Sequence, residues 1–429
     1  MNILFVTDQP FLKAANQVIY QSVKMFVDKG DYVIILGSGD TGHAVDTQYN
    51  PEDVFGREYV RYHQYVSKFA KLTRLLRGLR KQKKQKTLLP GSDCVLSFEG
   101  TRSNWKLSDV RLYIQSRKIA SLGNRVLRKQ KIDLIFCLEI GASKACEYLS
   151  QRHRIPLVSK YMGTIAYPYL MGRREVEIGP YISAYQSNSL LHFMLNDGTK
   201  GDEVLNKLGV SNDKVRFRID PVDLDKFQNL PVKNDDRLKL FGERFSETDI
   251  LYLTLSNHNA QYKRLDRIIR AFNEASTSHS SLIIVGHGSF TEEYRALAQG
   301  NAKIIFMGKV AHDQIPSILN ATDVYVNCND ESNLSHTVLE AMSAGKLLIT
   351  LNDGSVDNLL QHQENALLVE TKGIHEGMVA TIEEVERSPD LINKLGCEAK
   401  RTAEAVLMTW DEKNSLEHSE ILEKMESLC

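Results

Sequence analysis

Residues 250–272 read ILYLTLSNHNAQYKRLDRIIRAF, and this stretch carries the alternation that decides the fold. The first six residues are almost entirely apolar, as a strand that is buried on both faces requires. A polar loop follows, and apolar residues then recur at helical spacing from Leu265 to Phe272. The stretch therefore predicts a strand, a loop and a helix, which is the repeating unit of a parallel sheet.

The same unit recurs along the chain. Segments with helical period separate short apolar runs at residues 3–6, 32–36, 134–138, 282–285, 304–307 and 324–326. Such alternation in both halves predicts an α/β protein with two doubly wound parallel sheets.

The length of 429 residues favours two domains, because two units of about 200 residues bury apolar surface efficiently. Polar residues 228–248 separate the last strand-like run of the first half from the strand at residue 250, so we place the boundary there. This gives an N-terminal domain at 1–228 and a C-terminal domain at 249–405. Residues 406–429 form a terminal helix, for which a return to the N-terminal domain is one option.

The composition is ordinary for a folded protein, with 42% apolar residues, 25% charged residues and a formal net charge of zero. Six cysteines without CxxC spacing, and the lack of an apolar run of membrane-spanning length, predict a cytoplasmic protein. One segment departs from this balance, since nine Lys or Arg and no acid lie between Lys68 and Lys86. A helix on the anionic inner face of the plasma membrane and a solvated basic loop explain it equally well. No nucleic-acid-binding module accompanies it, so we expect no nucleic acid partner.

Polar and glycine-containing loops follow the strands of the second half. His258 and Lys263 follow the strand at residue 250, and Gly286 and Gly288 follow the next strand. Loops at the carboxyl ends of parallel strands bind phosphates, and glycines let a ligand approach the backbone. A solvated loop explains Lys263 and the adjacent Arg264 as well, so the loop alone does not decide between the two interpretations.

Residues 329–346, NDESNLSHTVLEAMSAGK, form the most informative segment. A polar loop runs into a helix near Ser335, so unpaired N–H groups at the helix N-terminus can face an anion. Glu340 lies one to two turns inside that helix among apolar residues, and a buried carboxylate needs partners such as sugar hydroxyls. A capped helix whose Glu340 reaches solvent or a lysine is the alternative.

In their order these segments resemble glycosyltransferase family 4. The corresponding parts are residues 253–263, 285–288 (VGHG), 306–310 (FMGKV) and 332–345, with 218–227 (RIDPVDLDKF) and 406–411 (VLMTWD) similar to its interdomain and closing segments. The resemblance implies a GT-B fold, in which two doubly wound Rossmann-like parallel-sheet domains face a central cleft. It also implies retaining transfer from a nucleotide-sugar.

By this resemblance Lys263 binds the donor diphosphate and Glu340 holds the ribose hydroxyls, while the backbone from Gly308 to Val310 contacts the base. The other expected donor-binding residues are Gly286, Gly288, Ser332, Asn333, Leu334, Ser335, His336 and Thr337, together with Asn16, which stands with Ala14 and Ala15 in place of the family's glycine pair and faces the donor phosphate from across the cleft.

Two positions depart from the family pattern. His258 stands where the family has an Arg, and Ser332 stands where it has a Glu that the adjacent Glu331 could replace. The expected catalytic set is therefore Lys263, His258 and Glu331. Glu139 takes the place of a frequent His on the acceptor side, although a loop carboxylate satisfied by its surroundings is an alternative.

We therefore expect transfer of a hexose or N-acetylhexosamine from a UDP- or GDP-sugar to a glycan, lipid-linked or protein acceptor. No Asp-x-Asp pair in a metal-binding context is visible, so we expect no metal and no cofactor beyond the nucleotide-sugar co-substrate. The altered positions His258 and Ser332 leave a second hypothesis, a catalytically inactive sugar-nucleotide-binding accessory subunit of another glycosyltransferase.

Overall fold

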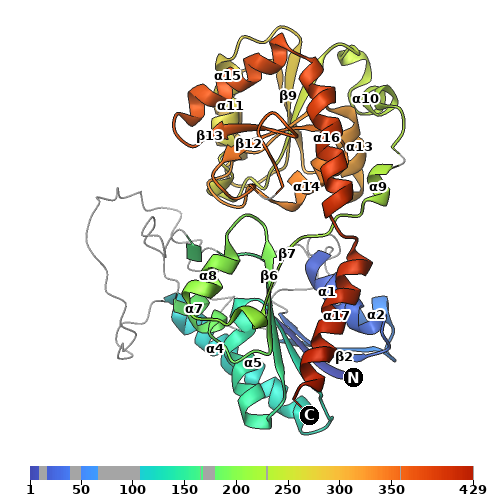
Figure 1. The fold of residues 1–429 in the computed structure, drawn as a ribbon, viewed down its shortest axis with the longest axis vertical. Helices are drawn as coiled ribbons and strands as arrows, with labels where there is room; N and C mark the ends of the chain where they lie inside the picture. Colours follow the sequence, from blue (N-terminus) through green and yellow to red (C-terminus); the bar gives the residue numbers. More distant parts are fainter. Residues whose placement is uncertain are drawn as a thin grey trace, which may run out of the picture.

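A computed structural model describes residues 1–8, 17–38, 50–65, 107–164, 166–167, 179–228, 230–357 and 359–428. Asn16 and the basic segment from Lys68 to Lys86 lie outside the described residues. The described chain forms two α/β domains, which are stacked along the long axis of the molecule (Figure 1). None of its helices is both long enough and apolar enough to span a bilayer.

The first domain is built on a seven-stranded parallel sheet with the strand order β3-β2-β1-β4-β5-β6-β7. Its strands are β1 (Asn2–Thr7), β2 (Tyr32–Ser38), β3 (Val60–Tyr65), β4 (Leu134–Leu138), β5 (Leu157–Tyr161), β6 (Leu191–Asn196) and β7 (Val215–Ile219). Its helices are α1 (Gln17–Val27), α2 (Pro51–Phe55), α4 (Leu107–Leu127), α5 (Ile140–His153), α7 (Gly179–Tyr185) and α8 (Gly201–Lys207), followed by the short η3 (Asn212–Lys214). Successive residues of β1 alternate between two apolar clusters, so both faces of the sheet are covered.

The second domain has a six-stranded parallel sheet with the order β10-β9-β8-β11-β12-β13. Its strands are β8 (Ile250–Leu255), β9 (Ser280–Val285), β10 (Ile304–Gly308), β11 (Val324–Val326), β12 (Leu347–Asn352) and β13 (Leu367–Glu370). Its helices are α9 (Asp225–Gln228), α10 (Lys233–Phe241), α11 (Leu265–Glu274), α12 (Thr291–Leu297), α13 (Ile315–Ala321), α14 (His336–Ser343), α15 (Ile374–Arg387) and α16 (Asp390–Val406), with the short η4 (Gly242–Arg244), η5 (Gln261–Lys263) and η6 (His312–Gln314). The prediction of two doubly wound parallel sheets is confirmed.

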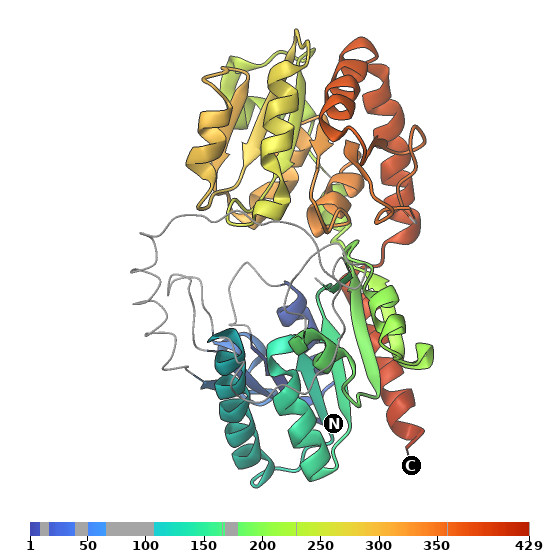
Figure 2. The same ribbon diagram turned by 90° about the vertical axis from the view of Figure 1, so that its left-hand side faces the viewer.

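The last helix, α17 (Trp410–Glu426), leaves the second domain and lies along the first, against α1 (Figure 2). Thr409 begins it with a capping box, because its hydroxyl accepts the Glu412 N–H at 3.3 Å while the Glu412 carboxylate accepts the Thr409 N–H at 2.8 Å. Ile421 is fully buried in the core of the first domain. The chain therefore crosses between the domains twice, after β7 and after α16.

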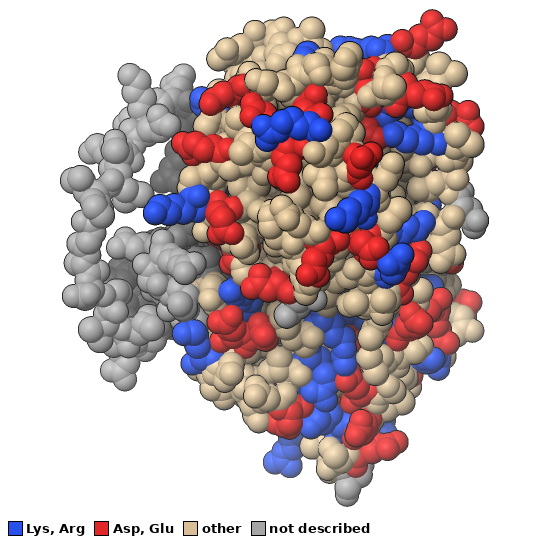
Figure 3. All heavy atoms as spheres, turned by 45° about the horizontal axis from the view of Figure 1, so that its top comes forward, with Lys and Arg blue, Asp and Glu red and all other residues tan. Residues whose placement is uncertain are grey.

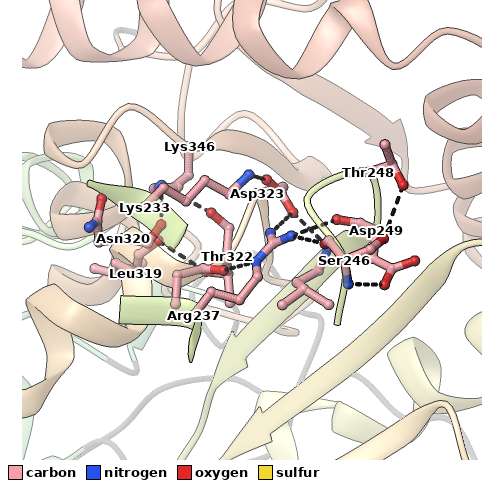
Figure 4. Close-up of polar contacts among 12 residues, drawn as sticks. Lys233, Arg237, Ser246, Thr248, Asp249, Leu319, Asn320, Thr322, Asp323 and Lys346 are labelled. Carbon is pink, nitrogen blue, oxygen red and sulfur yellow. Dashed lines mark hydrogen bonds and ion pairs between the residues drawn. The ribbon is translucent and has the colours of Figure 1, made fainter. Parts of the chain in front are cut away.

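A buried ion pair attaches α10 to the second sheet (Figure 4). Arg237 of α10 is 2% exposed and lies 2.9 Å from the carboxylate of Asp323, which precedes β11. Asp323 also accepts the Leu251 N–H of β8 at 2.7 Å. The Arg237 guanidinium donates further to the carbonyls of Ala321, Ser246 and Asp249. This single side chain thus ties together α10, the loop before β8 and the start of β11.

We predict that Arg237→Ala destabilises the second domain by about 3–5 kcal/mol, because it leaves the buried Asp323 carboxylate without its main counterion. Urea unfolding followed by circular dichroism measures the loss. Lys239→Ala on the exposed side of the same helix is the matched control and should change the midpoint little. Equal midpoints for the two variants would contradict the prediction.

Surface charge is balanced on the face shown in Figure 3, where Lys and Arg lie among Asp and Glu. This agrees with the formal net charge of zero. A balanced surface gives weak long-range attraction for polyanions, so any anion site on this face depends on local geometry.

Candidate active site

The loops after β8, β9, β10 and β11 lie at one edge of the second sheet, because all of its strands run parallel. This edge contacts the first domain through Asp197, which follows β6. The Asp197 carboxylate accepts the Ser332 hydroxyl at 3.0 Å, and its carbonyl accepts the Leu334 N–H at 3.2 Å. The carboxyl ends of the two sheets therefore meet where the domains meet.

The glycines after β9 are explained by packing. A Cβ on Gly286 would lie 1.8 Å from the carbonyl oxygen of Ser256, and one on Gly288 would lie 2.4 Å from the carbonyl carbon of His258. Both positions therefore require glycine for the β9 loop to lie on the β8 loop. Gly308 differs, because it has a φ of +77° and no atom lies within 4 Å of where a Cβ would stand. Its backbone, followed by the partly buried Val310, is open to a flat ligand.

His258 is completely buried beside that loop. Its Nδ1 lies 2.9 Å from the Thr291 hydroxyl, and its ring meets Tyr294 edge-on. Burial, and to a lesser degree His287, lowers the pKa of His258. Among the described residues its Nε2 has no hydrogen-bond partner. A neutral imidazole can donate one N–H but does not supply the positive charge of an arginine.

Lys263 and Arg264 have different surroundings. Arg264 takes a left-handed conformation with a φ of +46°, and its guanidinium binds Asp266 at 3.0 Å and Asp330 at 3.3 Å. Lys263 is partly buried with its ammonium 5.1 Å from the ring centre of Tyr262. Burial lowers the pKa of Lys263, and the Asp197 carboxylate partly opposes this. Arg264 thus stabilises the loop after β8 through its two ion pairs, while Lys263 faces the boundary between the domains.

The loop before α14 is organised by Asn333, which is fully buried. Its amide oxygen accepts the Asn329 N–H at 3.0 Å, and its amide nitrogen donates to the Asp353 carboxylate at 2.8 Å. Leu334 packs into the core, and Ser332 has a left-handed φ of +63°. The side chains of Asn333 and Leu334 therefore fix the conformation of the loop that leads into α14.

The N-terminus of α14 is not capped by a side chain. Ser335 occupies the N-cap position, but its hydroxyl pairs with that of Thr337 at 3.0 Å. The Thr337 hydroxyl in turn lies 2.8 Å from the phenol of Tyr325. Within the described residues, no hydrogen bond is made to the backbone N–H of His336 or Thr337. These two amides can therefore receive an anion.

Glu340, on the same helix, is 5% exposed. Its Oε1 lies 3.5 Å from Nε2 of His336 and 3.5 Å from Nε2 of His312. Burial raises the pKa of Glu340 to about 7 and lowers the pKa values of both histidines. The sequence pattern did not single out His312, which begins the short helix η6 after β10.

Glu139 follows β4 of the first domain and precedes α5, and it has a strained φ of +73°. Its carboxylate accepts the Met162 N–H at 2.7 Å. A Cβ on Gly141 would lie 2.0 Å from the Asp8 carboxylate, so Asp8 reaches over the start of α5. Burial, with Asp8 contributing, raises the pKa of Glu139 to about 7. Glu139 is thus a carboxyl group that changes charge near neutral pH.

A cavity of about 510 Å³ lies between the two domains. Thr164 and Lys200 line it from the first domain, and Arg267 and Asp353 from the second. Among the predicted site residues that the structure describes, Glu331 alone belongs to its lining. A second cavity, of about 520 Å³, lies on the outer side of the β8 loop at Tyr262 and Arg264. None of the predicted donor-binding residues that the structure describes lines either cavity.

Residues 236–402 match the family model described as glycosyl transferases group 1. The match lies almost wholly within the second domain, which is therefore similar to group 1 glycosyl transferase domains. Among curated proteins, the putative glycosyltransferase EpsD of Bacillus subtilis is 25% identical over 186 residues, which cover 42% of this chain and 48% of that protein. The putative glycosyltransferase YtcC of Bacillus subtilis is 30% identical over 105 residues, or 24% of this chain and 26% of that protein. The matches thus span about half or less of these two relatives.

Solved structures resemble the chain over its whole length. Sucrose-phosphate synthase from Thermosynechococcus elongatus superposes with a TM-score of 0.68 at 14% identity, covering 100% of both chains. Anabaena HepE, in a complex with UDP and glucose, superposes with a TM-score of 0.67 at 14% identity, covering 99% of both chains. The similarity establishes the GT-B fold that the sequence predicts for the whole chain.

We predict that Glu139→Gln removes a pH-dependent loss of stability. Because the folded pKa of Glu139 is raised from 4.5 to about 7, folded protein holds this proton between those pH values while unfolded chain has released it. The wild-type chain therefore loses up to about 3 kcal/mol from this group as pH rises from 4.5 to 7. Gln keeps the acceptor for the Met162 N–H but has no proton to release. The free energy of unfolding of the variant should therefore increase relative to that of the wild-type chain as pH rises from 4.5 to 7, and the difference should stay constant above pH 7. Unfolding midpoints measured across this pH range check the difference, and a gain that is independent of pH would contradict it.

Proposed function

We propose that the chain is a retaining glycosyltransferase that moves a hexose or N-acetylhexosamine from a UDP- or GDP-sugar to a hydroxyl of a glycan, lipid-linked or protein acceptor. The observation that carries the proposal is the N-terminus of α14, where the unpaired amides of His336 and Thr337 lie about one turn from the buried Glu340. An anion and a pair of hydroxyls would then be bound by one helix, as a nucleoside diphosphate requires.

Lys263 supplies the charge that this helix lacks. Breaking a glycosyl phosphate builds negative charge on the leaving diphosphate, and preorganised cations and N–H groups stabilise it. Lys263 is partly buried and beside the interdomain boundary, where its charge is only weakly screened. With the α14 amides it can neutralise the diphosphate, so turnover in this proposal needs no metal.

The base would lie on the backbone at Gly308, where no side chain intervenes. The ribose would reach Glu340 from there, since His312, which follows β10, already contacts this carboxylate. His258 has a smaller role in this arrangement, as an N–H donor beside the loop after β9. Glu331 supplies a carboxylate to the interdomain cavity. The acceptor would approach from the first domain, where Glu139 can accept a proton near neutral pH.

The relatives support the same chemistry. The matched curated proteins are described as glycosyltransferases, and the HepE structure holds UDP and glucose. Retention, the acceptor and the donor base are taken from the family resemblance and are part of the proposal. A membrane-bound acceptor would also give the basic segment from Lys68 to Lys86 a role.

An inactive accessory subunit is the second candidate, and two contacts favour it. His258 is neutral and engaged with Thr291, so no second cation stands at its position. Ser332 is engaged with Asp197, so the acidic position of the family motif is occupied by an interdomain contact. Turnover of a donor separates the two functions.

We predict that Lys263→Ala lowers turnover on the order of 10²-fold to 10³-fold, as loss of one charge-stabilising donor does in other active sites. The measurement is release of nucleoside diphosphate from UDP- and GDP-sugars, each with EDTA present and with acceptor glycans screened in parallel. Lys394→Ala on the exposed surface of α16 controls for the lost charge and should retain activity. Donor binding without release across the acceptor screen would instead favour the accessory subunit.

We predict that Glu340→Gln weakens binding of the matching nucleoside diphosphate by about tenfold, because a hydrogen bond to a charged group contributes about 1.5–3 kcal/mol. The 2′-deoxy nucleotide should bind wild type and variant more nearly alike. Isothermal titration of both nucleotides measures this coupling, with Glu364→Gln at an exposed position as the control. A loss that is the same for the ribose and deoxyribose nucleotides would show that Glu340 does not hold the ribose.

A further inference from the structure

Three metal-ligating side chains converge beside α14. His312, His336 and Glu340 place one ligand atom each within 4.8 Å of the others, and they are the one such group found in the described residues. The two imidazole Nε2 atoms each lie 3.5 Å from the same carboxylate oxygen, Glu340 Oε1. They come from different elements, since His312 begins η6 while His336 and Glu340 are one turn apart on α14.

We infer that these three residues form a binding site for a divalent transition-metal ion of the zinc class. Zinc binds His nitrogen and carboxylate oxygen at about 2.0–2.2 Å, which places neighbouring ligands of a tetrahedron about 3.4 Å apart. Two of the three edges, at 3.5 Å each, therefore match tetrahedral coordination, and the third, between the two imidazole nitrogens, is no longer than 4.8 Å. A set of two histidines and one glutamate leaves the fourth position for water or another ligand.

The donor set selects the class of metal. Two imidazole nitrogens and one carboxylate suit Zn²⁺, Co²⁺ or Ni²⁺, whereas Mg²⁺ and Ca²⁺ require oxygen ligands almost throughout.

The surroundings of His336 fit the role of a metal ligand. Its Nδ1 is buried, has no hydrogen-bond partner within the described residues, and lies 3.8 Å from the Asp220 carboxylate. A carboxylate behind the second ring nitrogen orients a ligating histidine and raises its basicity. Two cations face the cluster, but carboxylates neutralise both, since Lys226 lies 3.0 Å from Asp223 and Lys413 lies 3.5 Å from Asp220.

The site would regulate transfer by competition. A metal ion bound here occupies the Glu340 oxygen that the ribose would need, a consequence that rests on the function proposed above. Donor and metal then exclude each other, so zinc inhibits an enzyme whose own reaction needs no metal. Because donor and metal compete for Glu340, half-inhibition lies near the zinc dissociation constant only at donor concentrations below KM, and it moves to higher zinc as donor is added.

The first test is metal binding to the tag-free chain after treatment with chelator, with Zn²⁺ titrated against a chromophoric chelator. Loss of one ligand should weaken zinc binding at least about 100-fold, because mutation of a residue that only hydrogen-bonds to a ligand already lowers metal affinity by about 10–100-fold. We expect one tightly bound Zn²⁺ in the wild-type chain and in His279→Gln, an exposed histidine of the same domain, and a loss in His312→Gln. Equal affinities for His312→Gln and the wild-type chain would overturn the site.

Cobalt gives a test that needs no variant. Tetrahedral Co²⁺ absorbs visible light far more strongly than the hydrated octahedral ion, and the wild-type chain should show the tetrahedral spectrum when one equivalent is added. A spectrum equal to that of the free ion would overturn the coordination.

The inhibition is tested by donor turnover with and without Zn²⁺. Zinc should lower the turnover rate of the wild-type chain and of His279→Gln, each relative to its own rate without zinc, at concentrations that do not lower the rate of His312→Gln. Chelation of zinc by the nucleotide is the same in all three reactions and cannot cause the difference. Equal inhibition of all three would overturn the competition. If no donor is turned over, the proposed function fails, and the zinc and cobalt titrations still decide the metal site.

Discussion

The buried carboxylate of Glu417 fixes α17, the last helix of the chain, on the first domain. It is 1% exposed and lies 2.6 Å from the ammonium of Lys160 on β5 and 3.9 Å from that of Lys413. Burial alone would raise the pKa of Glu417, but the two lysines outweigh it and hold the pKa below its usual range. Separating such a pair leaves uncompensated buried charge, so α17 has one favourable position on the first domain. Further along the helix, the Glu420 carboxylate forms ion pairs with Arg216 and Arg218 of β7. Because α16 packs on α14 and β12 of the second domain while α17 packs on the first, the segment from α16 to α17 joins the two domains.

Each domain contributes different chemical groups to the site at the boundary between the two domains. The second domain presents an uncapped helix, a buried carboxylate and a lysine on loops that follow neighbouring strands. The first domain presents Asp197, which both contacts the loop before α14 and faces Lys263, and Glu139 deeper on its own sheet edge. Glu139 and Glu340 share one property, since burial raises the pKa of each to about 7. Both carboxyl groups can therefore donate or accept near neutral pH, which suits contacts with hydroxyl groups.

Sequence periodicity was sufficient for the fold class because strands such as β1, β4 and β8 are short apolar runs followed by polar loops, although β3 (VRYHQY) and β7 (VRFRI) are not. It was insufficient for α10, whose buried residues are Asp236 and Arg237 rather than apolar ones. Only tertiary contacts with Asn320 and Asp323 show why that helix forms where it does. For the site, sequence order located the loops at the correct sheet edge. It could not reveal that Gly286 and Gly288 are required by packing, nor that His312 meets Glu340, since these contacts join segments far apart in the chain.

The most direct test of the account is a crystal structure of the chain with a non-transferable nucleotide-sugar analogue. The account predicts that the diphosphate lies within hydrogen-bonding distance of Lys263 and of the His336 and Thr337 amides, with the ribose at Glu340. A diphosphate held instead in the interdomain cavity by Lys200 and Arg267 would contradict it.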